Sequence, residues 1–232
     1  MASSSIFWFR RDLRLNDNPA LLAAMAESEA VIPVFILDPK LIKTAGSKRL
    51  AYLGQSLHHL DDSLGNNLHV IAGDQITVLK ELMSKNNASS VHISTEYEPY
   101  GAKRDESVEA SGIKLVRTGS PYAVAPGRVR KPSDDTPYRV YTPFYKAWCA
   151  HGWRAPAKTP KEIKAPTPTE KYRAFPDFAV PAGTTIIEAE NKPTMLTFKI
   201  PTAFSKKTGI LHWNLVFDAW NFHDFQCVKD SN

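Results

Sequence analysis

Residues 6–20 read IFWFRRDLRLNDNPA: an apolar run, then a basic loop with a carboxylate, then a helix start. The apolar run predicts a strand that is covered on both faces. Asn18 followed by Pro19 predicts the first turn of a helix. Loops at the carboxyl ends of buried parallel strands face the crevice in which open α/β sheets bind ligands. The loop therefore predicts a site for an anionic or planar polar ligand, and the alternative is a solvated basic loop.

Further along, residues 5–118 alternate short apolar runs with helical patterns, which is typical of a parallel sheet built from βαβ units. Leucines recur at spacings of 3 and 4 over residues 50–64, which predicts an amphipathic helix. We therefore expect an α/β fold with a doubly wound, Rossmann-like, five-stranded parallel sheet and an irregular C-terminal extension. The expected strands are Ser5–Phe9, Val31–Leu37, Leu68–Ala72, Ser90–Ser94 and Ile113–Arg117.

Three regions are expected along the 232 residues. Residues 1–153 form the α/β domain, in which Thr142 and Pro143 start a last helix. Residues 154–181 are rich in proline and lysine, which predicts an interdomain linker. Residues 182–232 fit helix and strand periods equally and are expected to be a divergent tail that begins a truncated helical domain.

Composition narrows the function classes. Lys and Arg exceed Asp and Glu by 29 − 24 = 5, and the scattered basic residues favour nucleic-acid contact only weakly. No stretch approaches the roughly 20 apolar residues that span a bilayer, so we expect a cytoplasmic protein without membrane contact. Cys149 and Cys227 match no metal-ligand or disulfide spacing, and no metal site or catalytic nucleophile is expected.

Candidate site residues follow three of the expected strands. Arg10, Arg11 and Asp12 follow the first, Asp38 follows the second, and residues 96–100 (EYEPY) follow the fourth. Two cations, four carboxylates and several aromatic rings suit a planar heteroaromatic ligand. A triphosphate is disfavoured, because neither G-x-G-x-x-G nor G-x-x-x-x-G-K-[ST] is present.

Each candidate has a structural alternative. Asp38 with Pro39 also fits a simple turn, and residues 98–101 also fit a helix entry. From the residues alone, Arg104 and Asp105 are expected to be a surface pair on a helix. Trp8 is expected to be a core residue, and the adjacent histidines at 58 and 59 are expected to face solvent.

The order of the motifs resembles the amino-terminal antenna domain of the DNA photolyase and cryptochrome family. The resemblance spans residues 5 to about 155. It is carried by FWFRRDLR at 7–14, DNPA at 17–20, VIPVFILDP at 31–39, Tyr97-Glu98 with Arg104-Asp105, VAPG at 124–127 and YRVYTPF at 138–144.

That resemblance implies a cofactor and a biological role. Family members hold an antenna pigment in this domain, namely a deazaflavin, methenyltetrahydrofolate or a flavin, and the string EPYG at 98–101 resembles the deazaflavin-binding members. The pigment passes excitation to FAD in a separate helical domain, which repairs pyrimidine dimers in DNA as a carbon–carbon lyase. The residues implied around the pigment are Arg11, Phe35, Ile36, Leu37, Asp38, Glu96 and Glu98.

Departures from the family limit these implications. Signatures of the FAD domain are absent from the sequence, so the chain is not expected to repair DNA alone or to bind DNA more than weakly. We expect the chromophore as its partner, together with a separate FAD-domain polypeptide. Two alternatives stay open, a non-catalytic nucleotide- or flavin-binding module and a partner-docking module.

Overall fold

The computed structural model describes residues 3–183, 195–197, 213–218 and 221–227. The described residues fall into two compact units, residues 3–121 with 156–183 and residues 122–155 with 195–197, 213–218 and 221–227. The first unit contains β1 (Ser4–Phe9), α1 (Pro19–Glu27), β2 (Ala30–Leu37), α2 (Pro39–Thr44), α3 (Ser47–Ser63), β3 (His69–Ala72), α4 (Gln75–Asn86), β4 (Ala88–Ile93), α5 (Pro99–Ala110), β5 (Leu115–Arg117) and η1 (Glu170–Tyr172).

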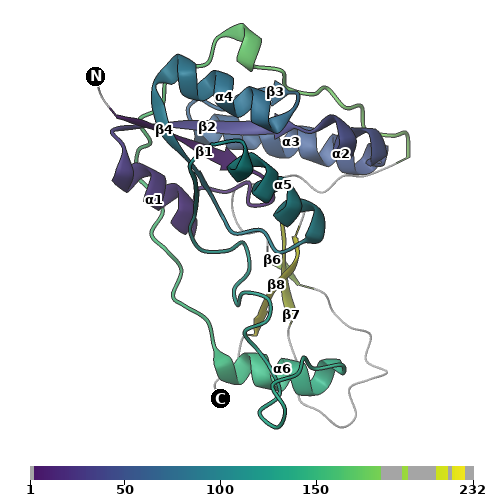
Figure 1. Cartoon of the computed structure of the whole chain (residues 1–232). Coiled ribbons are helices and arrows are strands. Elements are labelled where there is room, and N and C mark those ends of the chain that lie inside the picture. Colours follow the sequence, from purple (N-terminus) through teal and green to yellow (C-terminus); the bar gives the residue numbers. More distant parts are fainter. Residues whose placement is uncertain (1–2, 184–194, 198–212, 219–220, 228–232) are drawn as a thin grey trace. The chain divides into compact units, whose positions relative to one another are not determined.

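The sheet of the first unit is the expected five-stranded parallel sheet, with strand order β3-β2-β1-β4-β5. Figure 1 labels its first four strands. The chain winds outward from β1 to β3, then returns to the other side of β1 and continues to β5. This order makes the sheet doubly wound and puts its switch point between β1 and β4. All five strands begin within two residues of their expected starts.

Alternating side chains of the strands build two apolar layers. One layer joins Trp8 of β1 and Ile93 of β4 to Leu79 of α4 and Val108 of α5. The opposite face carries Ser5, whose hydroxyl donates to the Ala24 carbonyl of α1 at 3.3 Å. Helices therefore cover both faces of the sheet, which explains why its strands read as continuous apolar runs.

Local signals fix where the helices begin. Asn18 caps α1 by accepting from the Leu21 backbone N–H at 3.1 Å, with Pro19 at the first helical position, as predicted. Asp74 caps α4 by accepting from the Thr77 N–H at 3.0 Å, and α4 ends at Asn87 in the left-handed conformation, with φ of 49°. Asp38 caps the short helix α2, so the structural alternative to a site role for Asp38 and Pro39 is a helix start rather than a simple turn.

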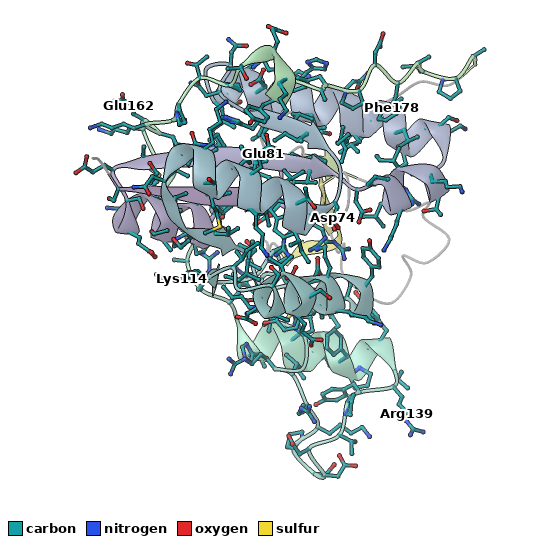
Figure 2. The ribbon with its side chains drawn as sticks, turned by 45° about the horizontal axis from the view of Figure 1, so that its top comes forward. Asp74, Glu81, Lys114, Arg139, Glu162 and Phe178 are labelled. Atoms are coloured by element: carbon teal, nitrogen blue, oxygen red, sulfur yellow. The ribbon has the colours of Figure 1, made fainter. Side chains whose placement is uncertain are left out.

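The segment expected as an interdomain linker belongs to the first unit and bonds β2 and β3 of its sheet. The Ala174 N–H donates to the Val70 carbonyl of β3 at 2.9 Å, and the Val31 N–H of β2 donates to the Lys164 carbonyl at 2.8 Å. Figure 2 shows Glu162 and Phe178 toward opposite ends of this segment, which we call the strap (residues 156–178). The expected boundaries at 153 and 181 thus differ from the compact units, because the strap returns to the sheet edge.

In the second unit, α6 (Tyr141–His151) begins next to the predicted Thr142-Pro143 start. β6 (Met195–Thr197), β7 (Trp213–Asp218) and β8 (Asn221–Cys227) form an antiparallel sheet in that order. The described part of the tail is therefore β-structure, which differs from the helical start that was expected. The remaining tail residues lie outside the described ranges.

Two buried histidines make the stability of the first unit depend on pH. Burial lowers the pKa of His69 on β3 and of His92 on β4, although Glu27 Oε2 lies 3.1 Å from His92 Nε2 and opposes the shift. A lowered pKa means that the unfolded chain takes up these protons more readily than the folded chain. Their contribution is therefore complete above the unfolded pKa of about 6.5 and is lost as the pH falls below it.

We expect the free energy of unfolding, measured by urea titration, to decrease between about pH 7 and pH 5. His92→Gln should make this decrease shallower, because the amide still donates to Glu27 but carries no titratable proton. The control is His59→Gln on the exposed side of α3, which should keep the full decrease. An equal slope in the two variants would contradict the assignment to His92.

Candidate functional site at the carboxyl edge of the sheet

The candidate site is formed by the loops that follow β1, β2 and β4. These strands are neighbours in the sheet, and all three are parallel, so their carboxyl ends meet at one edge. The loops after β1 and β4 flank the switch point of the sheet, where doubly wound domains bind ligands. The convergence that was predicted from distant positions in the sequence is therefore present.

Two contacts join the loop after β1 to the end of β4. The Ser94 hydroxyl donates to Asp12 Oδ2, and the Arg10 guanidinium donates to the Ser94 carbonyl. Asp12 and Arg10 are both buried. Ser94 was not among the predicted site residues, because it was expected to be the last residue of the fourth strand, which ends at Ile93.

A buried ion cluster lies beneath this edge. Arg10 Nη1 lies 2.6 Å from both carboxylate oxygens of Asp105, and Arg104 donates to Asp105 Oδ1 at 3.0 and 3.2 Å. The two guanidinium carbons lie 5.3 Å and 4.8 Å from the centre of the Trp8 ring, within cation–π range. Burial, and then the charge of Arg10, lower the pKa of Arg104, which nevertheless stays cationic.

This cluster corrects one expectation and confirms another. Arg104 and Asp105 are not a surface pair, because the Asp105 side chain is only 2% exposed and faces Arg10 across the fold. Trp8 is buried, as expected for a core residue, yet it also supports the two arginines. The cluster holds the start of β1's loop against α5.

Arg11, Glu96 and Glu98 come together as predicted. Arg11 Nη1 lies 3.7 Å from Glu96 Oε1 and 3.8 Å from Glu98 Oε1. Glu96 is largely covered, with 5% of its side chain exposed, and its Oε1 accepts from the backbone N–H groups of Tyr97 and Glu98. Glu98 is 51% exposed and, although it stands at the N-cap of α5, its side chain makes no cap hydrogen bond. Glu98 is thus the carboxylate of this group that is open to a ligand.

Gly101 makes room for Glu96. A Cβ atom at this position would lie 2.0 Å from Glu96 Cγ and 2.7 Å from its Cδ, so no larger residue fits unless Glu96 moves. The string at 98–101 is therefore a helix entry, as the structural alternative proposed, and its glycine also positions a candidate site residue.

Asp38 joins the group through α5. Its Oδ1 accepts from the Lys40 N–H at 2.9 Å and caps α2, while its Oδ2 accepts from the Tyr100 hydroxyl at 2.5 Å. Burial, and then the hydrogen bond to Asp38, raise the pKa of Tyr100 to about 12. Tyr100 was expected near this edge as one of residues 96–100, but its bond to Asp38 was not predicted, because only the fold brings the two side chains together.

The three apolar candidates lie inside the sheet. Phe35, Ile36 and Leu37 end β2 and are buried, and Ile36 belongs to the apolar layer beneath α4. Their side chains are packed beneath the edge of the sheet and are not open to a ligand on its surface. Their role around a ligand stays a prediction. Among the described residues, no three carboxylate, histidine or cysteine side chains are arranged to hold a metal ion.

Formal charge at this edge favours hydrogen-bond donors as ligands. Among the side chains described above, three arginines at 10, 11 and 104 stand against five carboxylates at 12, 38, 96, 98 and 105, so 5 − 3 leaves this group with an excess of two negative charges. Such an edge would repel a triphosphate. Carboxylates accept hydrogen bonds, so a planar ring with N–H groups fits the site chemically.

Comparisons with known proteins agree with this architecture. The DNA photolyase family matches residues 5–166. A deoxyribodipyrimidine photo-lyase of Synechococcus is 36% identical over 172 residues, which cover 70% of this chain and 35% of that protein. A bacterial class III photolyase from Agrobacterium tumefaciens superposes with a TM-score of 0.64 at 32% identity, covering 75% of this chain and 38% of that one.

An archaeal photolyase from Sulfolobus tokodaii is also similar, with a TM-score of 0.57 and 29% identity over 70% of this chain and 38% of that one. Its structure holds two FAD molecules and is described as implying a novel light-harvesting cofactor. The chain spans little more than a third of the length of these photolyases. Within the described residues, no helix is both long and apolar enough to cross a membrane.

Proposed function

The chain belongs to the DNA photolyase family, and from this premise we propose that its first unit is an antenna domain that binds a light-harvesting pigment. The observation that carries the proposal is that Arg11, Glu96 and Glu98 meet at the switch point of the sheet, while Asp38 at the end of β2 is joined to the same helix α5 through Tyr100. In this domain a pigment would absorb light and pass its excitation to a neighbouring flavin.

The carboxylates and the arginine of this site fit a pigment with ring N–H groups. Deazaflavins, pterins of the folate type and flavins all carry such groups, which carboxylates accept. Glu98 and Asp38 would accept ring N–H groups, Arg11 would donate to ring carbonyls, and Glu96 would hold Arg11 in place. The two FAD molecules in the Sulfolobus tokodaii structure support a flavin as one candidate. The string at 98–101 supports a deazaflavin as another.

Repair of pyrimidine dimers is the activity of the family, and we propose that it requires the FAD-binding part of these proteins, which an antenna domain serves. Nearly two thirds of the length of the matched photolyases lies beyond the region that this chain spans. In this proposal a separate polypeptide holds FAD and binds the damaged DNA, while the present chain supplies excitation and contacts DNA weakly at most. Both would work in the cytoplasm.

A second candidate function is partner docking through α6. The second unit exposes large apolar side chains on or beside this helix, where proteins commonly bind other proteins. They are Val140, Tyr141, Phe144 and Trp153, between 37% and 62% exposed. This docking is compatible with pigment binding, because it uses a different part of the chain.

An absorption spectrum of the purified chain tests the proposal. Incubation with a deazaflavin, methenyltetrahydrofolate or FMN should give a bound chromophore with a shifted band for at least one of the three. Glu98→Ala should weaken that binding by about tenfold, the effect of losing one hydrogen bond to a charged group.

Glu106→Ala is the matched control, because it removes the same side chain from the exposed face of the same helix. Its affinity for the pigment should equal that of the unchanged chain. If none of the three compounds binds, the antenna proposal is wrong and the docking function becomes the better account.

A further inference from the structure

Asp38 has no free carboxylate oxygen in the described structure. Oδ1 is committed to the backbone, because it accepts from the Lys40 N–H at 2.9 Å and so caps α2. Oδ2 is the oxygen left for a ligand, yet it accepts from the Tyr100 hydroxyl at 2.5 Å. The side chain is buried, with the residue 7% exposed, so solvent does not offer a second approach. A carboxylate oxygen can accept more than one hydrogen bond, but because Asp38 is buried, an N–H group that approaches Oδ2 competes with the tyrosine hydroxyl.

Tyr100 is placed to make that replacement possible. It lies in the first turn of α5, 62 residues from Asp38 in sequence, and the residue is 44% exposed. The helix itself is held by Asp105, which bonds Arg10 of the β1 loop. The phenol can therefore leave Asp38 by a side-chain rotation, while the helix stays where Asp105 holds it.

We propose that Tyr100 is a specificity-determining residue that competes with the ligand for Asp38, so that only a ring presenting an N–H group to Oδ2 displaces it. This inference rests on the proposed pigment-binding function. A ligand without that N–H leaves Oδ2 bonded to Tyr100 and gains nothing from Asp38. The ligand must therefore form a hydrogen bond to Oδ2 that is more favourable than the one from the Tyr100 hydroxyl.

The competition makes a specific prediction for Tyr100→Phe. Phenylalanine keeps the ring and removes the competing hydroxyl, so a ligand that uses Asp38 should bind about tenfold more tightly. Oxidised flavins suit the test, because lumiflavin has a single ring N–H, and 3-methyllumiflavin replaces that hydrogen by a methyl group. We expect the tenfold gain for lumiflavin and no gain for 3-methyllumiflavin.

Fluorescence titration of the full chain with both compounds measures these affinities. The control is Tyr141→Phe, which deletes a hydroxyl from a tyrosine of the second unit that is 55% exposed and should leave both affinities unchanged. Ultraviolet titration of the ligand-free chain adds a readout that needs no ligand. Tyr100 should ionise near pH 12, seen as the difference from Tyr100→Phe, and Asp38→Asn should lower that pKa.

The outcomes separate this inference from the antenna proposal. Binding of lumiflavin that is tighter in Tyr100→Phe than in the unchanged chain supports competition, as does binding seen only in Tyr100→Phe. Equal affinities, or an equal gain for 3-methyllumiflavin, would overturn competition and leave pigment binding intact. If neither the unchanged chain nor Tyr100→Phe binds either flavin, recognition of a flavin at Asp38 is wrong. The antenna proposal is then supported only if a deazaflavin or a folate binds with a shifted absorption band.

Discussion

Replacing Asp105 by asparagine is expected to lower the free energy of unfolding by about 3–5 kcal/mol, the cost of removing one partner from a buried ion pair. Asp105 is 2% exposed and accepts from Arg10 and Arg104 at distances between 2.6 and 3.2 Å. Asparagine has nearly the same shape, so the loss reports charge rather than volume. Two guanidinium groups would remain close together without their counter-charge.

Glu109→Gln is the matched control for Asp105→Asn. It removes one negative charge from the same helix and also faces an arginine, with Arg117 bonded to both oxygens of Glu109 at 2.9 and 3.1 Å. The Glu109 side chain is 50% exposed, however, so water replaces the lost partner and the cost should stay below about 1 kcal/mol. Urea titration at pH 7 measures both variants. Similar losses in the two would show that burial does not strengthen the Asp105 cluster.

The strands could be predicted from the sequence because each is covered on both faces. A strand such as β2 must then be apolar at every position, and its ends appear as polar residues or proline. Helix starts were also predictable, since Asn18 and Pro19 act within one turn of the chain. These signals are local, and local signals are visible in a single sequence.

The site was predictable only as far as strand ends reveal it. Arg11, Glu96 and Glu98 were found because each follows a strand directly or within a few residues. The bond between Asp38 and Tyr100 was missed, and so was the burial of Asp105, because these depend on side chains 62 and 95 residues apart. Arg104 and Asp105 are adjacent in sequence, so they were predicted to be a surface pair. The sequence does not show that Arg10, the third member of the cluster, bonds Asp105.

The strap was predicted to be a linker because of its composition, whereas in the structure it bonds the edge of the sheet. Proline and lysine dominate its composition, and such segments are usually solvated spacers. One residue reverses this interpretation, because Tyr172 is 4% exposed and belongs to the apolar layer that includes Leu79. Its hydroxyl donates to Glu81 at 2.9 Å, and Lys85 Nζ lies 4.4 Å from its ring centre.

Replacing Tyr172 by alanine is expected to cost about 3–5 kcal/mol of unfolding free energy, as for other buried aromatic residues. Tyr172→Phe keeps the ring and should cost only about 1 kcal/mol, the loss of one hydrogen bond to a partly exposed glutamate. Urea titration measures the difference between the two variants, which isolates the packed ring. Equal costs would place the stabilisation in the hydroxyl instead.

Tyr172→Ala should also release the strap from the edge of the sheet. Beside Tyr172, Arg173 bonds Asp61 at 2.7 Å and Ala174 bonds the Val70 carbonyl of β3, so the ring anchors contacts that cover an edge strand. Exposed edge strands pair with other chains. We therefore expect Tyr172→Ala to be cleaved by trypsin after Lys171 and Arg173 faster than Tyr172→Phe, and to aggregate more readily. Slow cleavage in both variants would mean that Arg173 and the backbone bond hold the strap without the ring.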